Sequence, residues 1–256
     1  GPRVVLVHAI GFDHHTWQPI LPALTDRYDV VALDLPGHGA SEKPPDADYG
    51  PLSLGARLIR LLDELGWDDA VFIGNSLGGG ASLAAALQAP ERVRGLGLLN
   101  SVGFRRGLPP VGRLAMVPLV PSLAGVAPPL AVRLGLASCR HARGSLTDER
   151  CTASRNYLRT RDGRAAFFRA LRQLYGQDLE KMAAHYPSIE CPALVLHGER
   201  DPLIRLSHAM QLAQTIPPAE LVRLQRCGHF PQEECPRQVG DALREFLENS
   251  VRHPRS

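Results

Sequence analysis

The amino-acid sequence predicts an α/β protein with a doubly wound, mostly parallel sheet and helices on both of its faces. Six short apolar runs, rich in valine, isoleucine and leucine, alternate with longer segments whose apolar residues recur at helical spacing. The runs are apolar at nearly every position instead of every second one. Such runs are typical of parallel strands that helices cover on both sides.

The predicted elements follow one another in a regular order. The strands are residues 4–7, 30–33, 70–73, 93–99, 193–196 and 220–224, and the helices are residues 16–24, 52–65, 77–88, 206–214 and 237–248. In the segment 52–65, for example, apolar positions recur as leucines 54, 58, 61, 62 and 65. This alternation predicts crossovers that place neighbouring strands in parallel.

One block, residues 103–188, interrupts this order. It contains no convincing strand, but apolar pieces broken by proline and arginine-rich helical pieces such as residues 165–174. Thirteen arginines and one lysine against five acidic residues give it a net charge of +9, while the remainder carries −6. We therefore expect a helical cap, or lid, of residues 103–188, inserted into a core domain formed by residues 1–102 and 189–256.

Composition limits the classes of function. The 256 residues, 44% hydrophobic and 21% charged, suffice for one α/β domain with an insertion, and a net charge of +3 is no basis for binding nucleic acid. Five cysteines show neither a C-x-x-C pair nor zinc-like spacing with histidine. We therefore expect no metal, no other cofactor, and reduced thiols in a cytoplasmic protein.

The apolar stretches and the start of the chain bear on location and assembly. The longest apolar stretch, residues 114–137, holds four prolines and an arginine, so we expect no stable insertion into a membrane. The chain begins at Gly1-Pro2, directly before a predicted strand, and we expect that some N-terminal residues are missing. The sequence is compatible with a monomer or a homodimer.

A serine lies between glycines at a predicted strand-to-helix junction. The segment Gly74-Asn75-Ser76-Leu77-Gly78 fits G-x-S-x-G, a sharp turn that holds a nucleophilic serine hydroxyl out for attack. Glycines are required there if helix and strand nearly touch. An ordinary glycine turn is the alternative, because serine is a common turn residue.

A serine becomes a strong nucleophile only beside a base that a third group orients. Asp201 follows the predicted strand 193–196, and His229 follows the strand 220–224. The carboxyl ends of parallel strands meet at one edge of the sheet, where ligands bind. The order Ser76, Asp201, His229 at three strand-to-helix junctions therefore predicts a catalytic triad.

Five segments carry a family resemblance. They are "VLVHAIGFDHHTW", "LDLPGHGAS", "GNSLGG", "LHGERDPL" and "CGHFPQEECP". Over nearly its whole length the chain resembles the α/β-hydrolase superfamily, which implies the α/β-hydrolase fold with an inserted cap. The resemblance also implies an oxyanion hole from the backbone N–H groups of Ile10 and Leu77. The usual histidine-glycine pair of the first segment is here His8-Ala9.

Two branches of the superfamily fit the motifs. A serine at position 76 argues against haloalkane dehalogenases and epoxide hydrolases, in which this residue is aspartate. Asn75 and Cys227-Gly228-His229 resemble the meta-cleavage-product hydrolases, which break a carbon–carbon bond and usually have tryptophan where Phe230 stands. These enzymes also place an arginine in the lid, for which Arg155 is our candidate. We expect Asn75, His14, Arg155 and Phe230 to bind substrate.

The sequence thus predicts a serine hydrolase that cleaves esters of small, largely apolar acyl compounds through an acyl-Ser76 intermediate, with water as co-substrate. The alternative within enzymes is a carbon–carbon bond hydrolase of 2-hydroxy-6-oxo-dienoates, which are vinylogous diketones. The alternative outside enzymes is a non-catalytic receptor for a small ligand. The positive charge of the cap further suggests that an anionic group of the substrate binds near the apolar acyl pocket.

Overall fold

The computed structural model describes residues 1–105, 120–176 and 179–252. In this part of the chain, six parallel strands form one sheet in the order β2-β1-β3-β4-β5-β6. The strands are β1 (Arg3–Val7), β2 (Asp29–Leu33), β3 (Ala70–Asn75), β4 (Val93–Leu99), β5 (Ala193–Gly198) and β6 (Ala219–Leu224). All six predicted strands are confirmed. The direction of the crossovers reverses between β1 and β3, so the loops that follow these two strands diverge and leave a crevice.

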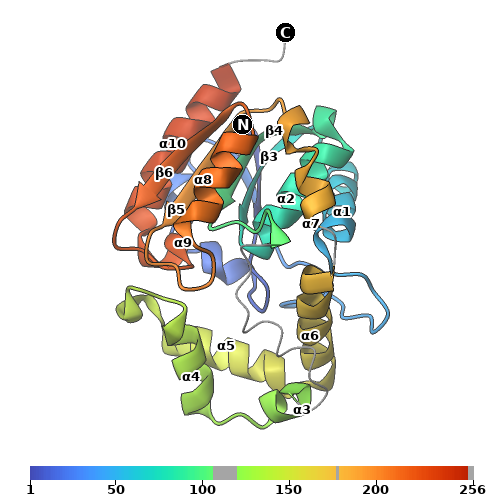
Figure 1. Cartoon of the computed structure of the whole chain (residues 1–256), viewed down its shortest axis with the longest axis vertical. Coiled ribbons are helices and arrows are strands. Elements are labelled where there is room, and N and C mark those ends of the chain that lie inside the picture. Colours follow the sequence, from blue (N-terminus) through green and yellow to red (C-terminus); the bar gives the residue numbers. More distant parts are fainter. Residues whose placement is uncertain (106–119, 177–178, 253–256) are drawn as a thin grey trace.

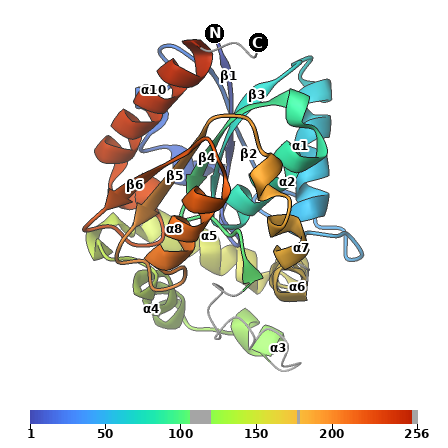
Figure 2. The same ribbon diagram turned by 45° about the horizontal axis from the view of Figure 1, so that its top comes forward.

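Helices cover both faces of the sheet, as predicted. On one face, α1 (Pro51–Glu64), α2 (Leu77–Gln88) and α8 (Leu206–Thr215) pack with Val5 and Val7 of β1. On the other, α10 (Pro236–Arg252) packs with Val4 and Leu6. Figure 2 shows the sheet between α10 and the pair α1 and α2. Alternate residues of one strand therefore enter two separate cores, which explains runs without polar positions.

The predicted helix over residues 16–24 is wrong. The segment forms two short 3₁₀ helices, η1 (His14–Trp17) and η2 (Leu21–Ala23). Pro19 and Pro22 lack the backbone N–H that a continuing α-helix needs. Trp17, Ile20 and Leu24 are nevertheless fully buried beneath the sheet. The helical spacing of the apolar residues therefore predicted their burial correctly and their backbone incorrectly.

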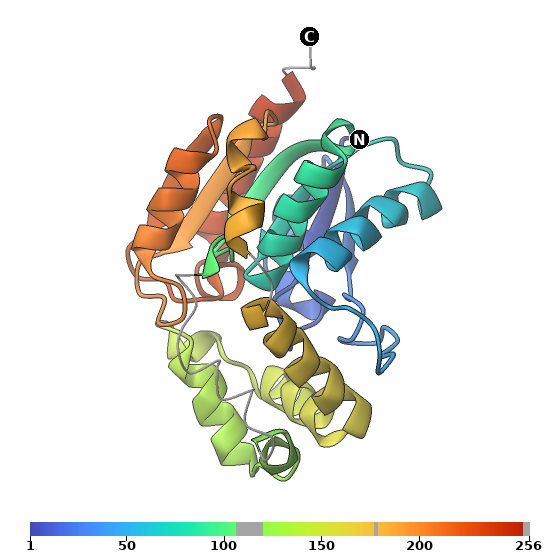
Figure 3. The same ribbon diagram turned by 45° about the vertical axis from the view of Figure 1, so that its right-hand side comes forward.

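Between β4 and β5 the described residues form helices and loops. These helices are α3 (Val120–Gly125), α4 (Pro129–Ser138), η6 (Arg143–Ser145), α5 (Asp148–Arg159), α6 (Arg161–Gly176), α7 (Leu179–Ala183) and η7 (Tyr186–Ser188); η3 (Pro90–Arg92) and α9 (Pro231–Glu234) lie elsewhere. Figures 1 and 3 show α3 to α6 grouped beyond one end of the sheet, with α7 beside α2. Leu179, Met182 and Tyr186 pack into the core of the sheet. This end of the predicted cap thus packs with the core domain.

Part of the long apolar stretch 114–137, residues 114–119, lies outside the described residues. Among the helices of the described segments, none is long and apolar enough to cross a membrane.

Candidate active site

Ser76 occupies the turn between β3 and α2. Its φ of +55° is a conformation that residues with a side chain rarely adopt. The Ser76 N–H donates to Leu99 O, and Ser76 O accepts from the N–H groups of Gly80 and Val102, all at 3.1 Å. The neighbouring strand β4 and the first turn of α2 thus hold this strained residue at the N-terminus of the helix.

Glycines at 74 and 78 permit the turn. A Cβ on Gly74 would lie 2.4 Å from the backbone of Gly78, and a Cβ on Gly78 would lie 2.1 Å from Val7 O. Backbone therefore touches backbone where β1, β3 and α2 meet. This confirms that the junction is too tight for side chains.

Replacing Gly78 with alanine is expected to lower the free energy of unfolding by about 3 kcal/mol or more, because the main chain at Val7 cannot move aside cheaply. The measurement is urea unfolding followed by circular dichroism. Gly135→Ala is the control: nothing lies within 4 Å of a Cβ there and the residue is helical, so it should be neutral or stabilising. Equal stability of the two variants would contradict the close approach.

The structure joins the predicted Asp201 and His229. His229 Nδ1 donates to Asp201 Oδ2 at 2.7 Å, and both side chains are buried. The other carboxylate oxygen, Oδ1, accepts from the N–H groups of Leu203 (2.7 Å) and Ile204 (3.1 Å). Because a carboxylate only accepts, Nδ1 carries a proton, and Nε2 is the nitrogen that can take up a second one.

Asn100, which the sequence analysis assigned no role, completes this arrangement. Asn100 Nδ2 donates to Asp201 Oδ2 at 2.6 Å and to Gly228 O at 3.2 Å, while its Oδ1 accepts from Gly198 N at 3.1 Å. The amide thus ties the acid loop to the histidine loop. The available signal was a polar residue directly after β4, at the same edge of the sheet as the predicted triad.

Burial of Asp201 alone would raise the pKa of its carboxyl group. The charge of His229 and the hydrogen bonds from His229, Asn100 and Leu203 outweigh burial and hold this pKa below its ordinary value. The acid therefore stays ionised through the neutral range.

A pKa lowered on folding has a consequence for stability. The contribution of ionised Asp201 is complete above the ordinary aspartate pKa of about 3.9 and is lost as the pH falls through the lower folded-state value. The difference in unfolding free energy between the wild type and Asp201→Asn should therefore shrink between about pH 5 and about pH 3. Urea unfolding at stepped pH measures it, and a constant difference would contradict the lowered pKa.

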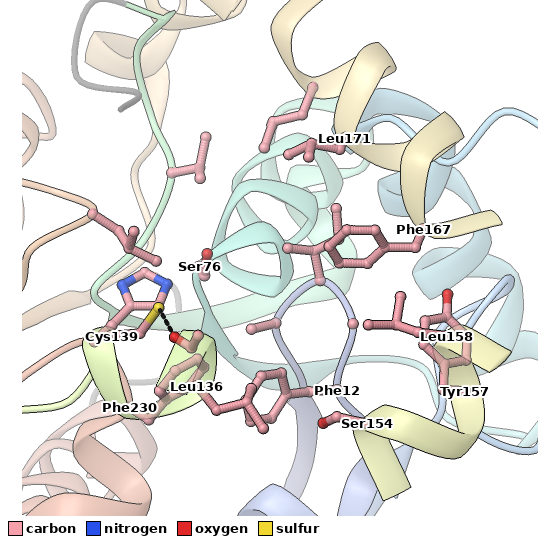
Figure 4. A pocket seen from close by; sticks show the side chains of 18 of the residues that line it. Phe12, Ser76, Leu136, Cys139, Ser154, Tyr157, Leu158, Phe167, Leu171 and Phe230 are labelled. Carbon is pink, nitrogen blue, oxygen red and sulfur yellow. Dashed lines mark hydrogen bonds between the residues drawn. The ribbon is translucent and has the colours of Figure 1, made fainter. Parts of the chain in front are cut away.

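Ser76 and His229 line the same cavity, of about 350 Å³. Figure 4 shows Ser76 at its wall, with Phe167 and Leu171 on one side and Phe12 and Leu136 on another. Within the described segments, no hydrogen bond joins the Ser76 hydroxyl to the His229 ring. Such contacts are often long in enzymes without substrate and tighten when substrate binds. The structure thus places the two groups at one cavity without a formed bond between them.

The cavity wall is largely apolar. Its side chains, besides Ser76 and His229, come from Ala9, Ile10, Phe12, Val102, Val132, Leu136, Cys139, Ser154, Tyr157, Leu158, Phe167, Leu171, Leu174, Tyr175, Leu203, Ile204 and Phe230. Among the described residues that line it, none is Asp, Glu, Lys or Arg. The cavity therefore suits an uncharged, apolar group.

Two backbone N–H groups near Ser76 have no acceptor within the described part of the chain. They belong to Ile10, which lines the cavity, and to Leu77, the first residue of α2. Leu77 N–H is one of the free donors at the positive end of the helix dipole. Ala9 does not have a positive φ, so the backbone at this position accommodates an alanine side chain without strain.

Of the four predicted substrate-binding residues, Phe230 lines the cavity, and its ring lies 4.3 Å from that of Phe12. Asn75 is not among the described lining residues. Its Nδ2 donates to Leu99 O (2.9 Å) and His229 O (3.1 Å), and its Oδ1 accepts from Gln232, so the side chain faces the protein interior. In this structure Asn75 therefore supports the histidine loop.

His14 and Arg155 are not among the described residues that line the apolar cavity either. His14 Nδ1 bonds to Asp34 Oδ1 at 2.9 Å, and the residue lines a second cavity. Ser154, Tyr157 and Leu158 present one face of α5 to the apolar cavity, but Arg155 does not line it. Successive residues of a helix point about 100° apart, so Arg155 faces elsewhere.

No cluster of three or more His, Cys, Asp or Glu side chains suited to a metal ion occurs in residues 1–105, 120–176 and 179–252. The cavity likewise presents no arrangement of charged groups that would hold a phosphate-bearing cofactor.

Fold and site together define a hydrolase built on a parallel sheet, with its candidate nucleophile in a strained turn after β3. The chain belongs to the alpha/beta hydrolase family, whose model matches residues 4–242. It is 34% identical to a 2-hydroxy-6-oxo-2,4-heptadienoate hydrolase of Pseudomonas putida over 258 residues, which cover 96% of this chain and 89% of that protein.

Two solved structures are similar over almost the whole chain. An alpha/beta hydrolase fold protein from Burkholderia ambifaria superposes with a TM-score of 0.84 at 29% identity, covering 95% of this chain and 90% of the other. A meta-cleavage product hydrolase from Pseudomonas fluorescens superposes with a TM-score of 0.83 at 26% identity, covering 98% and 92%.

Proposed function

We propose that this hydrolase cleaves carboxylic esters with small, apolar acyl groups through an acyl-Ser76 intermediate. The observation that carries the proposal is the apolar cavity, which has Ser76 and the hydrogen-bonded His229 in its wall and no ionised Asp, Glu, Lys or Arg among its described lining residues. An acyl chain buried there loses contact with water at no electrostatic cost.

The proposed reaction has two halves. His229 Nε2 takes the proton of Ser76 while Oγ attacks the ester carbonyl, and the free N–H groups of Ile10 and Leu77 bind the developing oxyanion. The imidazolium then gives its proton to the leaving alcohol. In the second half, His229 removes a proton from water, which attacks the acyl-serine; the imidazolium then returns that proton to Ser76 Oγ as the acid leaves. Asp201 keeps the proton on Nδ1 and stabilises the imidazolium.

A second candidate is carbon–carbon bond hydrolysis. It is favoured by the 34% identity to a protein named for a 2-hydroxy-6-oxo-2,4-heptadienoate substrate. Such a dienoate bears a carboxylate, which binds best beside a cation. No cationic side chain lines the cavity among the residues that the structure describes. We therefore rank ester hydrolysis first.

The described ion pairs of three cap arginines do not support the suggested binding of an anionic substrate group beside the acyl pocket. Arg133 pairs with Asp148, Arg140 with Glu233, and Arg150 with Asp13. These three arginines are thus engaged in ion pairs, Arg133 within the cap and the other two with acidic residues of the core domain. We expect neutral acyl esters to be cleaved faster than anionic ones, with little dependence of kcat/KM on salt.

The test is a comparison of substrates on purified protein. We expect turnover of p-nitrophenyl esters from acetate to octanoate, with kcat/KM rising with chain length until the cavity of about 350 Å³ is full. Faster cleavage of a 2-hydroxy-6-oxo-dienoate than of any ester would instead establish the second candidate. Binding of either compound with at most one turnover would indicate a receptor.

A further inference from the structure

In the described part of the chain, the cap is hydrogen-bonded to the histidine loop at a short turn, which we call the cap turn (residues 139–142, following α4). The histidine loop, as we use the term, comprises residues 227–230 and leads into α9. His229 N–H donates to Cys139 O of the cap turn at 3.0 Å. The backbone on which the proposed base sits is therefore bonded directly to the cap.

Glu234 of α9 clamps the two segments together. Its carboxylate accepts from the N–H groups of Gly228 (3.0 Å) and Phe230 (3.1 Å) on one side, and from those of His141 (2.8 Å) and Ala142 (2.9 Å) on the other. One side chain thus satisfies four backbone donors, two from each segment. Such charge-assisted bonds are stronger than bonds between neutral groups.

Next to it lies a buried ionic cluster that also spans cap and core. Glu233 of α9 is paired with Arg140 of the cap turn and lies 3.4 Å from Arg150 Nε of α5; Thr16 Oγ1 also donates to Glu233 at 2.7 Å. Arg150 extends the cluster to Asp13 at 3.0 Å. The side chain of Arg140 is 0% exposed and its Nε has no partner among the described residues.

A buried ion pair is a poor device for stability, because desolvation offsets much of the attraction. The buried, unpaired Nε–H of Arg140 lowers the stability of the folded state further. What such a pair does specify is geometry. Here the guanidinium of Arg140 lies over the ring of Phe230, with 4.4 Å between Cζ and the ring centroid. The Phe230 ring in turn meets the His229 ring edge-on at 4.9 Å.

We propose that Arg140 is a positioning residue: through Glu233 and Phe230 it holds the His229 ring in line with Asp201 and the cavity. The cap turn is then a part of the catalytic apparatus, and this side of the cap stays closed during turnover. The inference rests on the proposed role of His229. It predicts that loss of Arg140 affects the chemical step more than substrate binding.

The experiment uses the double variant Arg140→Met/Glu233→Gln, which removes both charges and so leaves no unpaired buried ion. With p-nitrophenyl hexanoate, kcat should fall on the order of 10- to 100-fold while KM changes less than about threefold. Arg140→Lys, which keeps a charge but not the planar stacking group, should restore only part of the rate.

The matched control is Arg169→Met. Arg169 also ties the cap to the core, through Ala47 O and Asp46 O, but on α6 and without contact to the histidine loop. Its loss should leave kcat within about twofold of wild type. If the double variant loses no more kcat than Arg169→Met, or if KM rises while kcat is unchanged, the positioning role is refuted.

A second readout needs no turnover and so separates this inference from the proposed function. Proton NMR of the wild type should show a far-downfield signal for the His229 Nδ1–H bonded to Asp201. This signal should broaden or vanish in the double variant and persist in Arg169→Met. A signal that is unchanged in the double variant, or absent from the wild type, contradicts the positioning even if no ester is ever cleaved.

Discussion

Replacing Ser76 with alanine is expected to reduce kcat/KM for p-nitrophenyl esters by about 10⁴-fold or more, since no acyl-enzyme can form. Substrate should still bind, because the apolar cavity wall is intact. The measurements are steady-state kinetics and the dissociation constant of a slowly cleaved ester.

The control for Ser76→Ala is Ser82→Ala. Ser82 lies on the same helix and is also buried, and within the described residues its hydroxyl bonds to Gly78 O alone, at 2.8 Å, so alanine there should retain activity. A Ser76→Ala enzyme that keeps most of the wild-type rate would refute the assignment of the nucleophile and, with it, the acyl-enzyme route.

Asp201→Asn is expected to have the second-largest effect, a loss of kcat/KM on the order of 10³- to 10⁴-fold. Both carboxylate oxygens accept hydrogen bonds, Oδ2 from His229 Nδ1 and Asn100 Nδ2 and Oδ1 from two backbone N–H groups, so the NH₂ of an amide must face donors on one side or the other. If the amide NH₂ faces His229, the ring must carry its proton on Nε2, and it then cannot accept the proton of Ser76. The measurement is kcat/KM of the wild type and of Asp201→Asn for one ester over a range of pH.

Asp34→Asn separates this effect from the mere loss of a buried carboxylate. The Asp34 side chain is 8% exposed and accepts from His14 and Ala40, but it does not line the cavity that contains Ser76. The variant should lower the melting temperature with little change in kcat/KM. Equal losses of activity in the two variants would indicate that Asp201 acts only through stability.

The sheet could be predicted because its inner strands β1, β3, β4 and β5 are buried on both faces and are therefore apolar at almost every position. The ends of the helices α1, α2, α8 and α10 match the prediction or differ from it by at most four residues. The failure over residues 16–24 has a clear cause: Trp17, Ile20 and Leu24 recur at helical spacing, yet two prolines remove the donors that an α-helix requires.

The candidate site could be predicted only in part. Ser76, Asp201 and His229 follow β3, β5 and β6, so the topology of a parallel sheet was enough to bring their loops to one edge. The direction of a side chain in a loop or on a cap helix depends on its hydrogen bonds and on helix rotation. For this reason the sequence did not reveal that the Asn75 side chain faces the interior and that Arg155 is not among the described lining residues, and Asn100 was overlooked although it binds Asp201.

By itself, then, the order of residues determined the strand and helix pattern and the nucleophile, acid and base candidates, because these follow from local periodicity and from where strands end. Only the tertiary structure decided which groups pair. Glu233 pairs with Arg140 and Arg150 across 93 and 83 positions of the chain. Two of the cap arginines thus bind the segment that directly follows the histidine loop. Pairing over such separations depends on how the cap docks on the sheet, and no local pattern encodes that.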